Sequence, residues 1–216
     1  MPMEFFLLTA TLLVAAFAIS RYLDYRRTQA VKAVADQIGF TYQETSTNFV
    51  DHRISQSTLC SKGRNRRLKN VIKGHSQDIQ VSVGDYNYTT GSGKNKSTHR
   101  QTIVILDCSR TYLPRFYLAP ENIFHKIGNF LGYPDINFDS HPTFSKRYRL
   151  TGPDEYAIRS CFDSSILTFF ETHSSFCVEG MGSVLLYYKR NYSCQPQEWQ
   201  KLINTAFRVY KQFYVG

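Results

Sequence analysis

The feature that most constrains this chain is its first 27 residues, an apolar run followed by arginines. Phe5–Ile19 holds fifteen residues without a charge, interrupted only by Thr9 and Thr11. With its flanking residues the run approaches the roughly 20 residues that cross about 30 Å of hydrocarbon. No Pro or Gly follows Pro2 within it, so an unbroken helix can satisfy its own backbone groups in lipid. We expect one transmembrane helix here.

The charges around the run predict its orientation. Glu4 is the one charged residue before it, whereas four basic residues follow it: Arg21, Arg26, Arg27 and Lys32. By the positive-inside rule this asymmetry places the C-terminal side in the cytoplasm. Tyr22 and Tyr25 fall where an interfacial aromatic belt lies. We therefore expect a single-pass protein of the inner (plasma) membrane with a cytoplasmic C-terminal domain.

Two other interpretations of the run stay open. A cleaved signal peptide has a basic segment before its apolar core, which is missing here, but Ala16-Phe17-Ala18 resembles a cleavage site. A core helix of a soluble domain is the other, and it fits poorly with so purely apolar a run. The expected organisation is an anchor over 1–22, a juxtamembrane helix over 23–39 and an α+β domain over 40–216.

The five cysteines agree with a reducing compartment. The cysteines are Cys60, Cys108, Cys161, Cys177 and Cys194. Their number is odd, their spacing is wide and no Cys-x-x-Cys pair is present, so they form neither a disulfide framework nor a zinc signature. Reduced, buried thiols are typical of cytoplasmic domains.

Period-two alternation and turn residues predict a mostly antiparallel sheet after Gly39. Alternating Ile79, Val81 and Val83 continue through Tyr88 into a Gly-rich loop, and the continuous run Thr102–Leu106 suggests a central strand. Pro114 restricts the start of the next strand to an edge or an entry position. The expected strands are 40–43, 58–60, 79–88, 102–106, 113–118, 148–150, 176–179 and 184–188.

Helical spacing and capping residues predict the helices. They are Ser20–Ile38, Pro120–Leu131, 154–162 with Thr151 as cap, 165–171 and Pro196–Tyr214. The last is strongly amphipathic, with an apolar stripe that should dock on the sheet. Because strands and helices do not alternate, the fold class is α+β: a transmembrane helix, an antiparallel sheet packed with helices, and a long amphipathic C-terminal helix.

The stretch from 102 to 189 resembles an uncharacterised family of bacterial membrane-anchored, single-span proteins. The likeness is carried by short segments: 102–106, Leu113-Pro114-Arg115-Phe116, 118–121, Phe144, 147–152, Asp154-Glu155, Arg159, Phe162, Glu179-Gly180 and Leu185-Leu186. No activity is assigned to that family, so no functional residue is carried over. The resemblance implies a membrane anchor.

Catalytic and metal patterns fail on inspection. Gly91-Ser92-Gly93-Lys94 lacks the first glycine and the final Ser or Thr of a phosphate loop, so we interpret it as a solvated hairpin tip. Glu121 and His125 would share a helix face, but a third metal ligand is missing. Neither a nucleophile elbow nor a cysteine with a recognisable base is present. We predict no cofactor and no metal, and whether the chain is an enzyme stays open, with a non-catalytic role favoured.

One basic segment is the candidate site. The net charge is +9, and 62–73 places six basic residues among twelve. A charge run is usually a solvated face, but near a cytoplasmic leaflet each Lys or Arg adds about 1 kcal/mol of attraction to anionic lipid. The candidate anionic-surface contacts are Lys62, Arg64, Arg66, Arg67, Lys69 and Lys73. We expect an interaction module that binds anionic lipid head groups or an unidentified membrane protein. The alternatives are a tethered enzyme with an unrecognised site and, less favoured for want of a motif, a nucleic-acid-binding protein.

Overall fold

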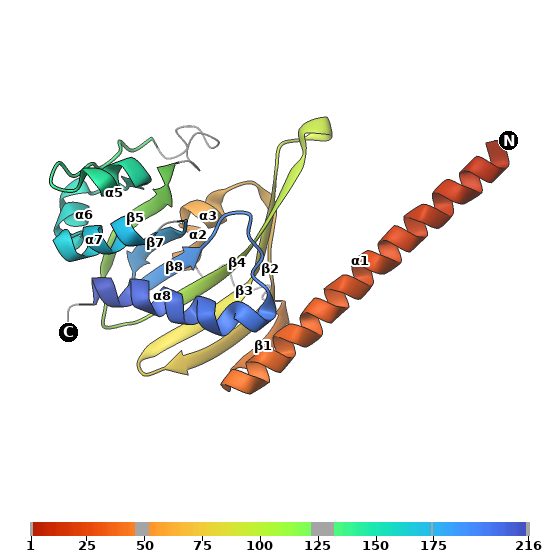
Figure 1. The fold of residues 1–216 in the computed structure, drawn as a ribbon, viewed down its shortest axis with the longest axis horizontal. Helices are drawn as coiled ribbons and strands as arrows, with labels where there is room; N and C mark the ends of the chain where they lie inside the picture. Colours follow the sequence, from red (N-terminus) through yellow and green to blue (C-terminus); the bar gives the residue numbers. More distant parts are fainter. Residues whose placement is uncertain (1, 46–51, 122–131, 174, 215–216) are drawn as a thin grey trace.

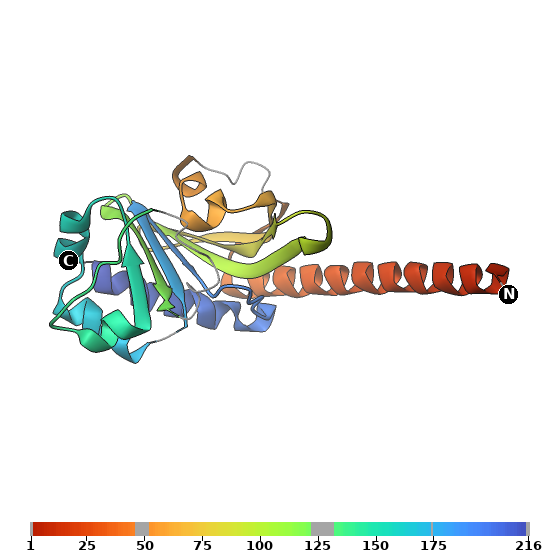
Figure 2. The same cartoon turned by 90° about the horizontal axis from the view of Figure 1, so that it is seen from above.

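A computed structural model describes residues 2–45, 52–121, 132–173 and 175–214. Its first element, α1 (Pro2–Ile38), is one continuous helix through the expected anchor and juxtamembrane segments. It ends at Gly39, whose φ of +71° is a left-handed conformation that favours glycine. Within the described residues, α1 is the one helix long and apolar enough to cross a membrane, judged by length and composition. Its N-terminal part projects away from the domain (Figures 1 and 2).

The domain is built on one eight-stranded antiparallel sheet of order β1-β2-β3-β4-β8-β7-β5-β6. The strands are β1 (Thr41–Thr45), β2 (Arg64–Ser76), β3 (Ile79–Thr90), β4 (Ser97–Asp107), β5 (Leu113–Pro120), β6 (Tyr148–Thr151), β7 (Cys177–Gly182) and β8 (Val184–Tyr188). The first four form a meander, and the β7–β8 hairpin lies between β4 and β5. The α+β class predicted from the sequence is confirmed.

Two apolar layers sandwich the sheet. One packs against the C-terminal third of α1, α5 (Pro142–Arg147), α6 (Glu155–Cys161), α7 (Ser164–Thr172) and α8 (Trp199–Phe213). The other packs against the short helices α2 (His52–Ser55) and α3 (Thr58–Ser61). Figure 2 shows α2 and α3 on the face opposite to α8. Val104 and Leu106 face the first layer while Ile103 and Ile105 face the second, so the predicted central strand is confirmed.

Two local predictions are wrong. Thr58–Cys60 is helical instead of extended, because Ser57 caps α3 by accepting a hydrogen bond from Cys60 N at 2.9 Å. The cap of α6 is Asp154, whose Oδ1 accepts from Ala157 N at 2.9 Å, whereas Thr151 pairs with Tyr117 in the sheet. An Asp one residue before the first turn competes well with Thr for this role.

The other expected helices and strands are present with shifted ends or lie outside the described residues, whereas β2 and α5 were not predicted. β5 lies between β7 and β6 and is not an edge strand, and Pro114 stands at a bulge near its start. The last helix has a 3₁₀ turn, η2 (Pro196–Glu198), before α8. The helix expected over 120–131 falls largely on residues that the structure does not describe.

Candidate functional site

The junction between α1 and the sheet is built on a charged pair. Arg27 of α1 donates from Nε and Nη2 to the two carboxylate oxygens of Asp85 on β3, at 2.7 and 2.6 Å. Its Nη2 also donates to the carbonyl of Cys194 at 2.8 Å. Asn70 and Thr102 donate to the same carboxylate at 3.1 and 3.2 Å. The carboxylate is therefore fully bonded, and the helix is held in one rotation about its axis.

Apolar packing continues this junction toward the end of α1. Val31 and Ala35 are fully buried and Val34 nearly so, in the layer that also holds Ile72 and Val83. Upstream, from Phe6 to Tyr25, the large apolar and aromatic side chains are 56% exposed or more. One rigid helix thus joins a domain-bound third to an uncovered apolar segment.

The six basic residues predicted as one surface do not form one. Lys62 is 6% exposed, and its Nζ lies 5.3 Å from the Tyr117 ring centre, so it belongs to the interior. Arg66 donates from Nη1 to the Cys60 carbonyl and supports α3. Lys73 pairs in register with Ser82, which places it on the face away from α1.

The other three share a face. Arg64, Arg67 and Lys69 pair in register with Thr89, Asn87 and Asp85, and side chains two residues apart on β3 point the same way. Because Asp85 faces α1, all three basic residues lie on the α1 side of the sheet. The predicted set is therefore split by the period-two geometry of β2.

Beneath α3 lies a buried acidic group that the sequence did not mark. Glu179 on β7 is 1% exposed and accepts hydrogen bonds from the backbone N–H groups of Thr58 and Leu59 and from the Tyr188 hydroxyl at 3.0 Å. Burial raises the pKa of the Glu179 carboxyl, against the opposing effect of these donors and of Lys62. Glu179 thus holds α3 onto the sheet.

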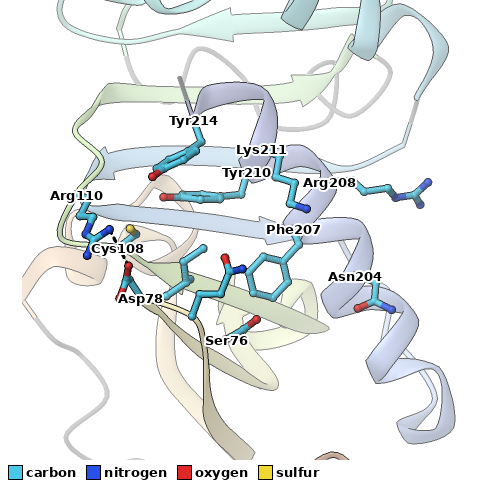
Figure 3. Close-up of a pocket in the computed structure, with 12 residues that line it drawn as sticks. Ser76, Asp78, Cys108, Arg110, Asn204, Phe207, Arg208, Tyr210, Lys211 and Tyr214 are labelled. Atoms are coloured by element: carbon cyan, nitrogen blue, oxygen red, sulfur yellow. Dashed lines mark ion pairs between the residues drawn. The ribbon is translucent and has the colours of Figure 1, made fainter. Parts of the chain in front are cut away.

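A groove opens beside the start of β3, at the end of the sheet opposite the β3–β4 hairpin tip. It lies between the β2–β3 turn, the end of β4 and α8 (Figure 3). Its volume of about 710 Å³ is in the range of ligand sites. Phe207, Tyr210 and Tyr214 supply aromatic surface from α8, and the two tyrosine rings stack with centres 6.1 Å apart. Phe207, at the margin of the apolar face of α8, and Tyr214, just after the helix, line this groove, and Phe207 also packs against the core.

The groove carries an excess of positive charge. Three cationic side chains line it against the single carboxylate of Asp78: Arg110, Arg208 and Lys211. Arg110 Nη1 lies 2.9 Å from Asp78 Oδ2, and both side chains are more than half exposed. In Figure 3 Lys211 extends over the groove, whereas Arg208 points away from it. The lining suits a ligand that is both acidic and apolar.

A thiol lies at the back of the groove. Burial raises the pKa of Cys108, but hydrogen bonds from the Tyr210 hydroxyl and from Arg110 N and Thr111 outweigh it, so this pKa lies below the ordinary value. The residue is only 2% exposed, and no histidine lines the described groove. A nucleophile needs access and a base, and this thiol has little access to the groove.

Within the described part of the chain, no three His, Cys, Asp or Glu side chains are grouped to hold a metal ion. Of the pair considered for a metal, Glu121 follows β5, while His125 lies outside the described residues. Gly91–Lys94 forms part of the β3–β4 hairpin tip, with a 3₁₀ turn over Gly93–Asn95, as expected for that loop. All five cysteines are free thiols.

Fold and junction together define the class: an antiparallel α+β domain carried on a long helix that is a candidate membrane anchor. No family model matches the chain, and comparison with curated proteins finds no match. Among solved structures, it is similar to the mycobacterial trehalose monomycolate transport factor A, TtfA, with a TM-score of 0.61 and 14% identity. The match covers 87% of this chain and 92% of that one. At this identity the likeness shows a shared fold.

Proposed function

We propose that this chain is a single-span, non-catalytic interaction module that α1 anchors in the inner membrane, with its domain on the cytoplasmic face. The observation that carries the proposal is the continuity of α1, which runs from an exposed apolar segment into the domain core without a break. Such a helix transmits its position in the bilayer directly to the domain. The arginines after the apolar run support the cytoplasmic orientation.

The partner we propose is a protein of the same membrane, bound through the groove beside α8. Aromatic residues and arginine are enriched at protein interfaces, and the groove combines three aromatic rings with Lys211 and the Arg110–Asp78 pair. An acidic segment with apolar side chains fits this lining. The fold shared with a transport factor supports an accessory role beside a membrane protein.

Site-specific photocrosslinking tests this proposal in the full chain, in native membranes. Benzoylphenylalanine replaces Phe207 in the groove or, as the matched control, the exposed Tyr156 on α6. We expect a discrete adduct with one membrane protein from position 207 alone. Lys211→Glu should abolish it, because the charge reversal repels an acidic segment.

The same experiment separates the competing classes. Equal adducts from both positions, or an adduct that Lys211→Glu leaves unchanged, would overturn the partner site. A tethered enzyme would instead show a small molecule bound in the groove and turnover lost on Lys211→Glu. A nucleic-acid-binding protein would show an affinity that falls steeply with salt.

A further inference from the structure

Five cations gather at the end of the sheet from which β3 and β4 extend as a hairpin. Arg67 lies opposite Asn87 on β3, which in turn lies opposite Arg100 on β4, so both guanidinium groups share one face. Arg64, opposite Thr89, extends this face by one register pair. We define the membrane-facing surface as these three exposed arginines with the exposed lysines of the tip: Arg64, Arg67, Arg100, Lys94 and Lys96.

This end of the sheet faces the same way as the N-terminal part of α1. The ring of Phe40, just after α1, packs where a Cβ on Gly74 would stand, and Gly74 pairs with Val81 near the start of β3. Thirteen residues before Phe40, Arg27 of α1 bonds Asp85, which lies farther along β3 toward the tip. Followed toward its N-terminus, α1 therefore runs alongside β3 in the direction of Thr90.

The hairpin tip reaches past the point where α1 leaves the domain. From Asp85 to Thr90 β3 rises about 17 Å, at ~3.4 Å per residue. The same rise along α1 takes about 11 residues at 1.5 Å each, counted from Arg27 toward the apolar run. The two axes diverge, which shortens this reach, but Figures 1 and 2 show the tip projecting beyond the body on the side of the free part of α1. Because this count reaches Ala16, inside the apolar run, the tip lies in the head-group layer when α1 is tilted in the bilayer, and spanning helices tilt by about 20° on average.

The chemistry of the surface suits that layer. Within the described residues, none of its five cations has an ion-pair partner, and the nearby carboxylate of Asp85 is committed to Arg27. The tip between Thr90 and Thr98 is entirely polar and small-chained apart from its lysines. A segment of this composition stays among head groups and does not enter hydrocarbon. Phosphate oxygens are the acceptors that arginine binds in bidentate geometry.

We propose that the membrane-facing surface docks on anionic phospholipid head groups of the bilayer that α1 spans. The inference rests on the proposed anchoring by α1. It adds a second membrane contact, in which the hairpin binds the leaflet and holds the domain close to it. The predicted lipid-binding segment is thereby relocated. Arg64 and Arg67 remain in it, Arg100, Lys94 and Lys96 join it, and Lys62, Arg66, Lys69 and Lys73 leave it.

A depth measurement on the full chain tests the docking. Ser92→Cys at the tip, or Ser76→Cys at the end of β2 beside the start of β3, is labelled with an environment-sensitive fluorophore in a Cys161→Ser background. Vesicles contain either phosphatidylcholine alone or equal parts of phosphatidylcholine and phosphatidylglycerol, each with a head-group quencher. We expect quenching at position 92 in the anionic vesicles only, and none at position 76. About 1 M NaCl, where the Debye length is about 3 Å, should reverse the quenching.

Charge variants identify the residues. The ratio of docked to undocked tip should fall about fivefold for each cation removed, in Lys94→Gln with Lys96→Gln and in Arg67→Gln with Arg100→Gln. The matched control, Lys146→Gln with Arg147→Gln in α5, removes the same charge outside both proposed surfaces and should leave the quenching unchanged. Equal quenching in neutral vesicles, or an equal effect of the control pair, would overturn the docking.

Alkaline extraction separates the two proposals: loss of the whole chain from the vesicles means that the anchor fails, whereas a retained chain with an unquenched tip means that only docking fails.

Discussion

Arg27 and Asp85, 58 residues apart, form a two-point contact at 2.7 and 2.6 Å that joins the candidate anchor to the third strand of the sheet. The two side chains are 23% and 11% exposed, so solvent screens them only in part. A bidentate pair fixes angle as well as distance. The orientation of the domain relative to α1 is therefore set by this pair together with the apolar packing behind it.

Breaking this pair should loosen the junction. We expect Arg27→Gln and Asp85→Asn each to lower the free energy of unfolding by about 2 kcal/mol, less than the ~3–5 kcal/mol of a fully buried pair because Arg27 is partly exposed. The double variant should lose less than the sum of the two. Trp199, the one tryptophan, reports the transition in detergent, since its Nε1 donates to the Cys194 carbonyl that Arg27 also bonds. Additive losses would mean that the two groups are not coupled.

The buried carboxylate of Glu179 should make stability depend on pH. Its folded pKa is raised above the ordinary value of 4.5, so the folded chain holds this proton more tightly than the unfolded chain. The stability contributed by protonation is fully present below about pH 4.5 and is lost as the pH rises through the folded pKa. We therefore expect the free energy of unfolding of the natural chain, minus that of Glu179→Gln, to fall from pH 4.5 toward neutrality. A difference that grows with pH would mean that the donors of Thr58 and Leu59 lower the pKa.

Much of the fold could be predicted because its signals are local. Alternation along Ile79–Val83, the continuous run at Thr102–Leu106 and the apolar stripe of the last helix each encode burial within a few residues. The errors arose where a single side chain decides between states, as Ser57 does for α3 and Asp154 for α6. The order of the sheet, with β7 and β8 inserted between β4 and β5, depends on contacts far apart in the sequence and had no local signal.

The candidate sites were harder to predict because their residues come from several strands. The basic segment was visible as composition, but only the register separates Arg67 from Lys73 and joins it to Arg100 across Asn87. The groove combines a turn, a strand end and a helix face. Phe207 and Tyr214 did carry a signal, since they lie at one margin of the apolar stripe. Without the sheet in place, such a margin cannot be distinguished from core.

Thiol labelling should report orientation only through introduced cysteines. Burial raises the pKa of Cys60, Cys161 and Cys194 to about 11 and that of Cys177 to about 12, and Cys108 is 2% exposed. The natural chain should thus stay nearly unlabelled by a membrane-impermeant maleimide, in intact or permeabilised cells. Ser76→Cys should label only after permeabilisation, and Met3→Cys in intact cells. The reverse pattern would place the domain outside.

Gly180 should tolerate no side chain, for a reason that lies in the aromatic core. A Cβ at this position of β7 would overlap the ring of Phe116, which Phe162 and Phe213 hold with ring centres 5.0 and 5.5 Å away. Because the ring cannot move without shifting both neighbours, we expect Gly180→Ala to cost about 1–3 kcal/mol. Gly84→Ala is the milder comparison, since its Cβ would meet Leu68 Cδ1 at 3.0 Å and the Lys69 carbonyl oxygen at 3.2 Å, against 2.3 Å to the Phe116 ring at Gly180. Denaturant unfolding followed by Trp199 fluorescence should show the smaller loss for Gly84→Ala, and equal losses would mean that the ring yields as easily as the leucine.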